Sequence, residues 1–200
     1  MKLFYSPAAC SLAVHILLRE TGQPFELARV DTKAHRTADG ADYYAINPKG
    51  YVPLLELDDG TRLTEGPVIA QYLCDRAGRP DLMPAAGTMQ RYRVLEWQSY
   101  LTSEIHKSFT PLFNPAYDAA ARAIVLGILR RKYEWLSAQL SEREYLTGTY
   151  TAADTYLFTL TRWAPGVKLD LGDLAPIQAY LARINARPEV REALAAEGLS

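Results

Sequence analysis

The pattern of apolar and polar residues divides the chain into a mixed first part and a helical second part. An apolar run at 3–5 predicts a strand, and the apolar segment 12–20 predicts a helix after a Ser-Pro break. Alternation over 25–30 predicts a second strand, preceded by a turn that contains Gly22 and Pro24. Residues 1–30 are therefore expected to form a strand–helix–strand unit with parallel strands.

A hairpin and another helix are predicted next. The polar segment 32–42 is expected to be a loop, and residues 43–46 a short helix. Residues 51–57 and 61–63 flank an Asp-Asp-Gly sequence that is typical of a tight hairpin turn. Thr64 is expected to cap a helix that has Pro67 in its first turn. The first part therefore predicts a βαβ–ββα order.

Only helical periodicity follows after about residue 86. Helices are predicted at 88–108, 119–140, 151–164, 174–186 and 189–195, and Pro111 is expected to limit the end of the first. Thr151 and Asp154 predict a capping box at the start of the third. The outline is an α/β domain at 1–80 and an all-helical domain at 87–200.

Charge and cysteine content narrow the possible functions. The 200 residues include 22 basic and 23 acidic ones, so a net charge of −1 gives no case for nucleic-acid or anionic-membrane partners. No transmembrane segment or signal peptide is expected, and the reducing cytoplasm is the expected location. The two cysteines and three histidines show no metal-ligand spacing, so no metal site is expected.

Cys10 stands directly before the first predicted helix. Unpaired N–H groups and the positive end of the helix dipole could lower its thiol pKa, or could hold a ligand's thiolate or carboxylate. The alternative is a small buried residue beside a helix cap. Because Cys10 lies in no Cys-x-x-Cys sequence, thiol chemistry there needs an external partner thiol.

Three further stretches have both a functional and a structural interpretation. A cis bond at Val52–Pro53 would turn the Val52 backbone outward toward a peptide-like ligand, whereas a trans bond would be an ordinary strand edge. The helix start at Glu65 and Gly66 could bind a carboxylate and an ammonium group, or Glu65 could simply complement the helix dipole. A polar stripe at helical spacing is either a solvated face or the lining of a cleft; its members are Glu96, Ser99, Ser103 and His106.

Five segments in this order and spacing resemble those of bacterial glutathione transferases, most closely the beta class. They are YSPAACS (5–11), NPKGYVP (47–53), TEGP (64–67), EIHKSFTPLF (104–113) and TAAD (151–154). The resemblance implies a thioredoxin-like N-terminal domain, an all-α C-terminal domain, a homodimer and a glutathione site.

The resemblance also implies roles for particular residues. Cys10 would lie beside the glutathione sulfur, Val52 would pair with the cysteinyl backbone next to a cis Pro53, and Glu65 and Gly66 would hold the γ-glutamyl end. The site would be completed by Ser99, Ser103, Glu104 and His106, in part from the partner subunit. The residues expected to act in catalysis are Cys10, Ser11, Tyr5 and His106.

Three positions depart from the family pattern, among them Thr155, which follows the capping box where a large apolar residue is usual. His35 stands where a lysine commonly contacts the glycine carboxylate of glutathione, with Lys33 and Arg36 nearby, and Ser99 stands where an asparagine is common. The clamp on the glycine carboxylate is therefore expected to be weaker than usual.

The leading hypothesis is transfer of glutathione to small apolar electrophiles. The alternatives are glutathione-dependent thiol–disulfide exchange or peroxide reduction through Cys10, and a non-catalytic ligand-binding protein on the same fold. Candidate wall residues for the electrophile are Tyr5, Phe109, Phe113, Tyr117 and Trp163.

Overall fold

The computed structural model describes residues 1–199, which form two compact units. One unit consists of Met1–Met83 together with the segment that begins at Arg187, and the other is Pro84–Ala186. The domain boundaries at 1–80 and 87–200 stay a prediction.

The first unit is built on a mixed sheet of five strands in the order β3-β2-β1-β4-β5. Its elements along the chain are β1 (Lys2–Tyr5), α1 (Ser11–Glu20), β2 (Glu26–Asp31), β3 (Arg36–Thr37), α2 (Tyr43–Ile46), β4 (Leu54–Glu56), β5 (Arg62–Thr64) and α3 (Gly66–Arg76). β1 and β2 are parallel, and β4 and β5 form an antiparallel hairpin, as predicted. The predicted fold class, a thioredoxin-like sheet with helices followed by an all-helical part, is confirmed.

The loop prediction for 32–42 is wrong at two residues. β3 pairs antiparallel with the end of β2, where Val30 faces Thr37. A strand of two residues is too short to produce an alternation that can be seen in the sequence.

Alternate residues of the strands supply two core layers. Leu3 and Leu55 are fully buried on one face, and Phe4 and Leu54 are buried on the other. Phe4 and Leu54 belong to a cluster with Val30, Tyr43 and Val52, against which Ile46 of α2 also packs. The short helix α2 therefore closes this face of the sheet near the chain segment that leads to Pro53.

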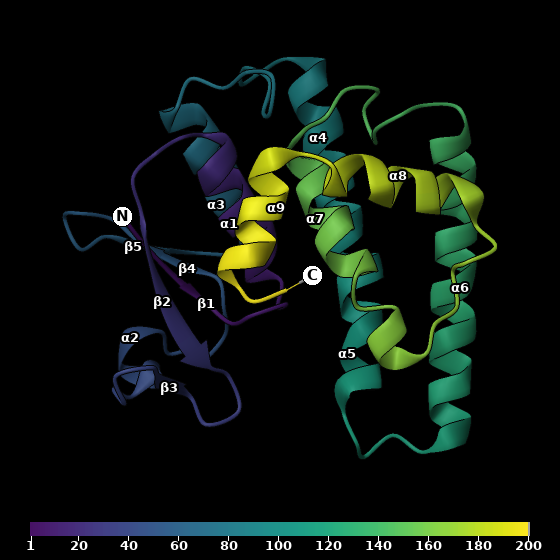
Figure 1. Ribbon diagram of the computed structural model, residues 1–200, viewed down its shortest axis with the longest axis horizontal. Coiled ribbons are helices and arrows are strands. Elements are labelled where there is room, and N and C mark those ends of the chain that lie inside the picture. Colours follow the sequence, from purple (N-terminus) through teal and green to yellow (C-terminus); the bar gives the residue numbers. More distant parts are fainter. Residues whose placement is uncertain (200) are drawn as a thin grey trace. The chain divides into compact units, whose positions relative to one another are not determined.

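The second unit is helical. Its elements are α4 (Met89–Tyr100), the π-helix η1 (Leu101–His106), α5 (Lys107–Phe113), α6 (Ala119–Ser141), α7 (Ala152–Thr161), the 3₁₀-helix η2 (Pro165–Val167) and α8 (Ala175–Asn185) (Figure 1). Pro111 was expected to limit the end of the helix predicted at 88–108, but it lies inside α5, which continues to Phe113. Because Pro111 is close to the end of α5, its missing N–H removes only one backbone hydrogen-bond donor from the helix.

The predicted capping box is confirmed at the start of α7. The backbone N–H of Thr151 donates to Asp154 Oδ2 at 2.8 Å, and its hydroxyl donates to the same oxygen at 3.0 Å. The N–H of Leu146 donates to the other oxygen of this buried carboxylate at 3.0 Å. Burial nevertheless raises the pKa of Asp154 to about 6.

The last helix, α9 (Pro188–Ala196), belongs to the first unit and packs along α1 (Figure 1). None of the helices within 1–199 combines the length and the apolar character that a membrane crossing requires.

Candidate functional site

Cys10 is the N-cap residue of α1 and directly precedes its first residue, Ser11. Its thiol donates to the carbonyl oxygen of Val52, with 3.1 Å between Sγ and oxygen. The backbone N–H groups of Cys10 and Ser11 favour the thiolate, but burial outweighs them and raises the pKa of the thiol to about 11. Of the two interpretations left open for Cys10, the lowered pKa is therefore not supported, because desolvation exceeds the effect of the helix start.

The segment that faces Cys10 exposes a backbone edge. The Val52–Pro53 peptide bond is cis. The carbonyl of the preceding Tyr51 accepts from the Tyr43 hydroxyl at 2.9 Å and from the Asn47 amide at 2.7 Å, which fixes the approach to this bond. The N–H of Val52 donates to no acceptor within residues 1–199, so it is available to a bound backbone.

The start of α3 lies beside the same proline. Glu65 has a left-handed backbone with φ 68° and is the residue before the helix, while Thr64 still belongs to β5. The predicted Thr64 cap is therefore wrong, whereas Pro67 does lie in the first turn. A Cβ atom added to Gly66 would lie 3.9 Å from Pro53 Cγ, which shows how closely this helix start approaches the proline.

The Glu65 carboxylate forms an ion pair with Lys49. It accepts from Lys49 Nζ at 2.7 Å, and the same ammonium group reaches the Thr64 hydroxyl at 2.9 Å. Both charged side chains are more than half exposed. Glu65 therefore already binds an ammonium group in an open position, where a ligand's ammonium could take the place of Lys49.

His35 has a more enclosed position than a surface lysine would have. Its backbone is left-handed, its ring stacks on Tyr44 at 4.3 Å, and its Nε2 lies 3.1 Å from the Tyr44 hydroxyl. Its Nδ1 is buried without a hydrogen-bond partner among the described residues. A Cβ at Gly50 would lie only 3.0 Å from that nitrogen and 2.6 Å from the Tyr44 ring, so a glycine is needed there. Lys33 and Arg36, by contrast, are exposed.

Two predicted catalytic residues lie in the interior. The Ser11 side chain is buried and bonds back to Ser6, accepting from its N–H and donating to its carbonyl, each at 3.2 Å. Tyr5 is 8% exposed at the end of β1, with its ring 6.2 Å from that of His15. In the described structure Ser11 thus shapes the turn before Cys10.

The remaining predicted site residues lie in the helical unit on or beside the π-helix. The wider π turn begins at Leu101, so the regular α-helical stripe assumed for Glu96 to His106 does not hold across it. Glu96 pairs with Arg93 at 2.7 Å, and Glu104 pairs with Lys132 at 2.9 Å. Ser99 and Ser103 are exposed, with the Ser103 hydroxyl donating to the Ser99 carbonyl at 3.1 Å. No sequence signal indicated this π segment, although π turns are frequent at functional sites.

His106 is partly buried against aromatic side chains. Its Nδ1 lies 2.7 Å from the Tyr156 hydroxyl, and its ring is 5.0 Å from that of Trp163. Burial, and to a lesser degree the charge of Lys107, lowers the pKa of His106 to about 4. The imidazole is therefore neutral at pH 7 and acts as a donor or acceptor of hydrogen bonds rather than as a cation.

Trp163 lies next to two other residues that were predicted to line the electrophile site, Phe109 and Phe113. Its ring lies 5.4 Å from Phe109 and 5.6 Å from Phe113. Phe109 is fully buried, whereas Phe113 is 56% exposed and Tyr117 is 40% exposed. Phe109 thus supports an aromatic surface that Phe113 and Trp163 present.

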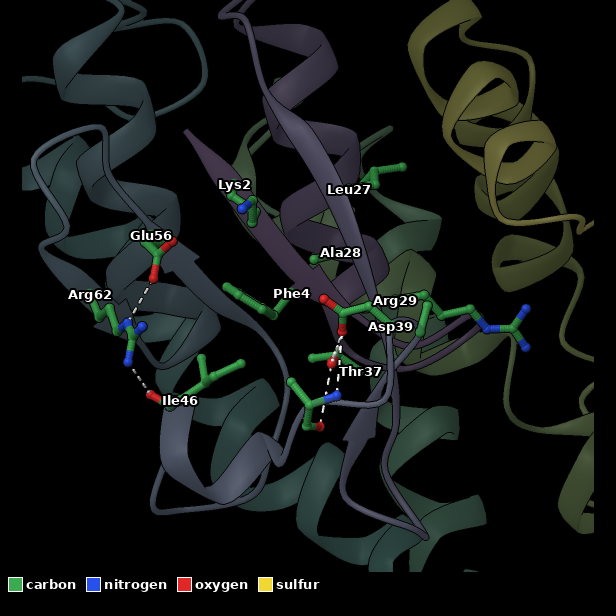
Figure 2. Close-up of a pocket in the computed structure, with 12 residues that line it drawn as sticks. Lys2, Phe4, Leu27, Ala28, Arg29, Thr37, Asp39, Ile46, Glu56 and Arg62 are labelled. Carbon is green, nitrogen blue, oxygen red and sulfur yellow. Dashed lines mark hydrogen bonds and ion pairs between the residues drawn. The ribbon is translucent and has the colours of Figure 1, made fainter.

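A separate pocket of about 420 Å³ opens on the sheet of the first unit and contains none of the predicted site residues. Phe4, Ala28 and Ile46 give it an apolar lining (Figure 2). Its polar rim is largely paired internally: Arg62 donates to Glu56 and to the Ile46 carbonyl, each at 2.8 Å, and Thr37 donates to Asp39. Within residues 1–199, no group of three His, Cys, Asp or Glu side chains has a metal-binding arrangement.

Comparison with known proteins decides the family. The family model for the glutathione S-transferase N-terminal domain matches residues 8–76, and the model for the C-terminal domain matches residues 100–188. The chain is 48% identical to the glutathione S-transferase GstA of Escherichia coli O157:H7, over all of both chains. The chain belongs to the glutathione S-transferase family.

Solved structures agree with this assignment. A sphingomonad glutathione S-transferase complexed with glutathione matches with a TM-score of 0.95 and 43% identity over all of both chains. The bacterial beta-class enzyme of Sphingomonas chungbukensis matches with a TM-score of 0.96 and 41% identity, again over all of both chains. The resemblance of this transferase to the bacterial beta class is thereby confirmed.

Proposed function

We propose that this transferase conjugates glutathione to small apolar electrophiles, and that it is a cytoplasmic homodimer. The observation that carries the proposal is the arrangement around Cys10. The first turn of α1, the free N–H of Val52 and the start of α3 at Gly66 all adjoin the cis Val52–Pro53 segment. A relative with a similar fold has been solved in complex with glutathione.

The chemistry of each group suggests its role. The Val52 N–H would pair with the cysteinyl backbone of glutathione as an added strand would. The N–H of Gly66 and the Glu65 carboxylate would hold the carboxylate and ammonium of the γ-glutamyl end. His35 would approach the glycine carboxylate, and Ser99, Ser103, Glu104 and His106 would contribute further contacts.

The reaction would use the thiolate of glutathione rather than that of Cys10. A thiol with a pKa of about 11 stays protonated at pH 7 and donates its S–H. When glutathione binds, the Cys10 S–H would donate to its thiolate in place of the Val52 carbonyl, and the N–H groups at the start of α1 would stabilise the same thiolate. Its sulfur lone pair forms the new carbon–sulfur bond, and the leaving group departs with the electron pair of the bond that breaks.

The raised pKa also bears on the alternative reactions. Thiol–disulfide exchange and peroxide reduction require Cys10 as a thiolate, and burial disfavours that form. The protonated thiol therefore favours conjugation over both alternatives.

Two measurements test the proposal. Calorimetry of the protein with glutathione should show binding, and incubation with glutathione and chlorodinitrobenzene should release the thioether product. Binding without turnover of any aromatic or alkyl halide would favour the ligand-binding alternative. If glutathione does not bind, every hypothesis that depends on glutathione is rejected.

A further inference from the structure

A buried carboxylate from the end of the chain reaches the turn before Cys10. Glu197 directly follows α9, and its side chain is fully buried. One carboxylate oxygen accepts from the backbone N–H of Ala8 at 3.0 Å. Ala8 stands two residues before Cys10, although Glu197 is 189 residues away in the sequence.

The Ala8 backbone has an unfavourable conformation. Its φ of 61° is left-handed, a conformation that costs a residue with a Cβ about 1–2 kcal/mol. The turn is also held by the Ala9 N–H, which donates to the Ser6 carbonyl at 3.1 Å, and by the Ser6–Ser11 bonds. The hydrogen bond from the Ala8 N–H to the Glu197 carboxylate is a contact that comes from outside this turn.

The second Glu197 oxygen is held by His15. His15 Nδ1 lies 2.9 Å from Glu197 Oε1, and both side chains are fully buried. Arg19 Nε donates to His15 Nε2 at 3.1 Å. Because a guanidinium group has no acceptor, His15 Nε2 must accept, and Nδ1 must therefore carry the proton that it donates to Glu197.

The Glu197 carboxylate thus accepts from two donors, the Ala8 N–H and the His15 Nδ1–H. A buried carboxylate is tolerated only where such donors satisfy it, so its position is narrowly fixed. Since α9 packs along α1, the helix that Cys10 directly precedes, Glu197 bridges the turn before the thiol and the helix after it.

We infer that Glu197, oriented by His15, is a positioning residue that fixes the Ser6–Cys10 turn for glutathione binding. Through Glu197, helix α9 thereby helps to position the turn that precedes Cys10. The inference rests on the proposed function for its kinetic consequences, but it makes a separate statement about the reactivity of Cys10.

The chain offers a matched control on the same pair of helices. Arg187 binds Glu20 with two hydrogen bonds, at 2.8 and 3.0 Å, and the Glu20 carboxylate is 3% exposed. Arg187→Ala therefore also removes a partner from a buried carboxylate between α1 and α9. These two bonds involve neither Ala8 nor His15, so the variant tests whether a weakened contact between α1 and the start of α9 is enough to change KM or the reactivity of Cys10.

Glu197→Ala and Glu197→Gln should each raise the KM for glutathione, by about tenfold for alanine and less for glutamine, with kcat changed less than about threefold. Alkylation of Cys10 by iodoacetamide, followed by peptide mass, should become severalfold faster as the turn opens. Arg187→Ala should lower the thermal midpoint but leave both readouts within about twofold of wild type.

Two results would overturn the inference. The first is a Glu197→Ala protein that matches Arg187→Ala in KM and in Cys10 alkylation. If the alanine variant does not fold, the second is a Glu197→Gln protein with unchanged alkylation and unchanged amide exchange in the peptide 6–10. Because alkylation needs no glutathione, an inactive wild type would reject the proposed function and still leave Glu197 tested.

Discussion

The Cys10 thiol donates to the carbonyl oxygen of Val52, 3.1 Å away, across the two segments that flank the candidate glutathione site. This bond links the start of α1 to the cis Val52–Pro53 segment. The thiol itself remains protonated at pH 7, because desolvation of the sulfur raises its pKa to about 11. Cys10 is therefore suited to donate a hydrogen bond to the glutathione thiolate rather than to ionise itself.

The role of Cys10 as a donor predicts the effect of two substitutions. Cys10→Ser keeps a donor at this point and should retain most of the conjugation rate, whereas Cys10→Ala should lower kcat/KM by about tenfold, the value of about one hydrogen bond to a charged group. Steady-state kinetics with chlorodinitrobenzene measures both.

Intact mass after incubation with oxidised glutathione separates this role from covalent chemistry. A burst of mixed disulfide on the wild type at pH 7, together with complete loss of conjugation in Cys10→Ala, would contradict the donor role. Cys74 is buried, so it serves as the internal control for unspecific modification.

Removal of the Glu65 charge should weaken glutathione binding. In Glu65→Gln the ammonium of glutathione would lose its counter-charge, and we expect the Kd to rise by about tenfold, or about 1.4 kcal/mol. Isothermal calorimetry with glutathione measures the change.

Glu56→Gln provides the control for Glu65. Glu56 also forms an ion pair on the first unit, with Arg62 at 2.8 Å, but it lines the pocket on the sheet rather than the start of α3. Its Kd should stay within about twofold of wild type. An equal weakening in both variants would show a general electrostatic effect rather than a contact at Glu65.

The buried His106 predicts a loss of stability in acid. Its pKa of about 4 in the folded protein lies below the ordinary histidine value of 6.5, so the unfolded state binds more protons between these pH values. This contribution is complete above pH 6.5 and is lost as the pH falls toward 4. The wild type should lose up to about 3 kcal/mol of unfolding free energy more than His106→Gln over this range.

Urea unfolding at several pH values between 4 and 7 tests this difference. Asp154 gives the opposite sign, because its pKa is raised, and it is present in both proteins. Parallel pH curves for wild type and His106→Gln would show that His106 is not desolvated in solution.

Thr151→Ala should destabilise the helical unit. The substitution removes the hydroxyl that donates to the buried Asp154 carboxylate at 3.0 Å, and we expect a cost of about 1–2 kcal/mol. Thermal and urea unfolding measure it.

Thr147→Ala is the matched control for Thr151. Its exposed hydroxyl donates to the Thr149 carbonyl at 3.1 Å in the loop just before α7, and its loss should cost no more than about 0.5 kcal/mol. Equal costs in the two variants would contradict a special role for the capping box.

Local sequence signals determined most of the fold. The alternation at 25–30, the Asp-Asp-Gly turn and the Thr151–Asp154 spacing each act within a few residues, and each predicted the element that the structure contains. Local signals also identified Cys10, Val52 and Glu65 as candidate site residues, because a helix start or a proline can be recognised in the sequence without knowledge of distant contacts.

Tertiary structure decided what those residues can do. The pKa of Cys10 depends on the desolvation of its thiol, Glu65 takes its left-handed turn where β5 meets α3, and the π turn at Leu101–His106 has no local signature. Glu197 is the clearest case: the sequence ends a helix there, but only the packing of α9 on α1 brings its carboxylate to Ala8. Burial and long-range hydrogen bonds are properties of the folded chain, so no local pattern of residues can encode them.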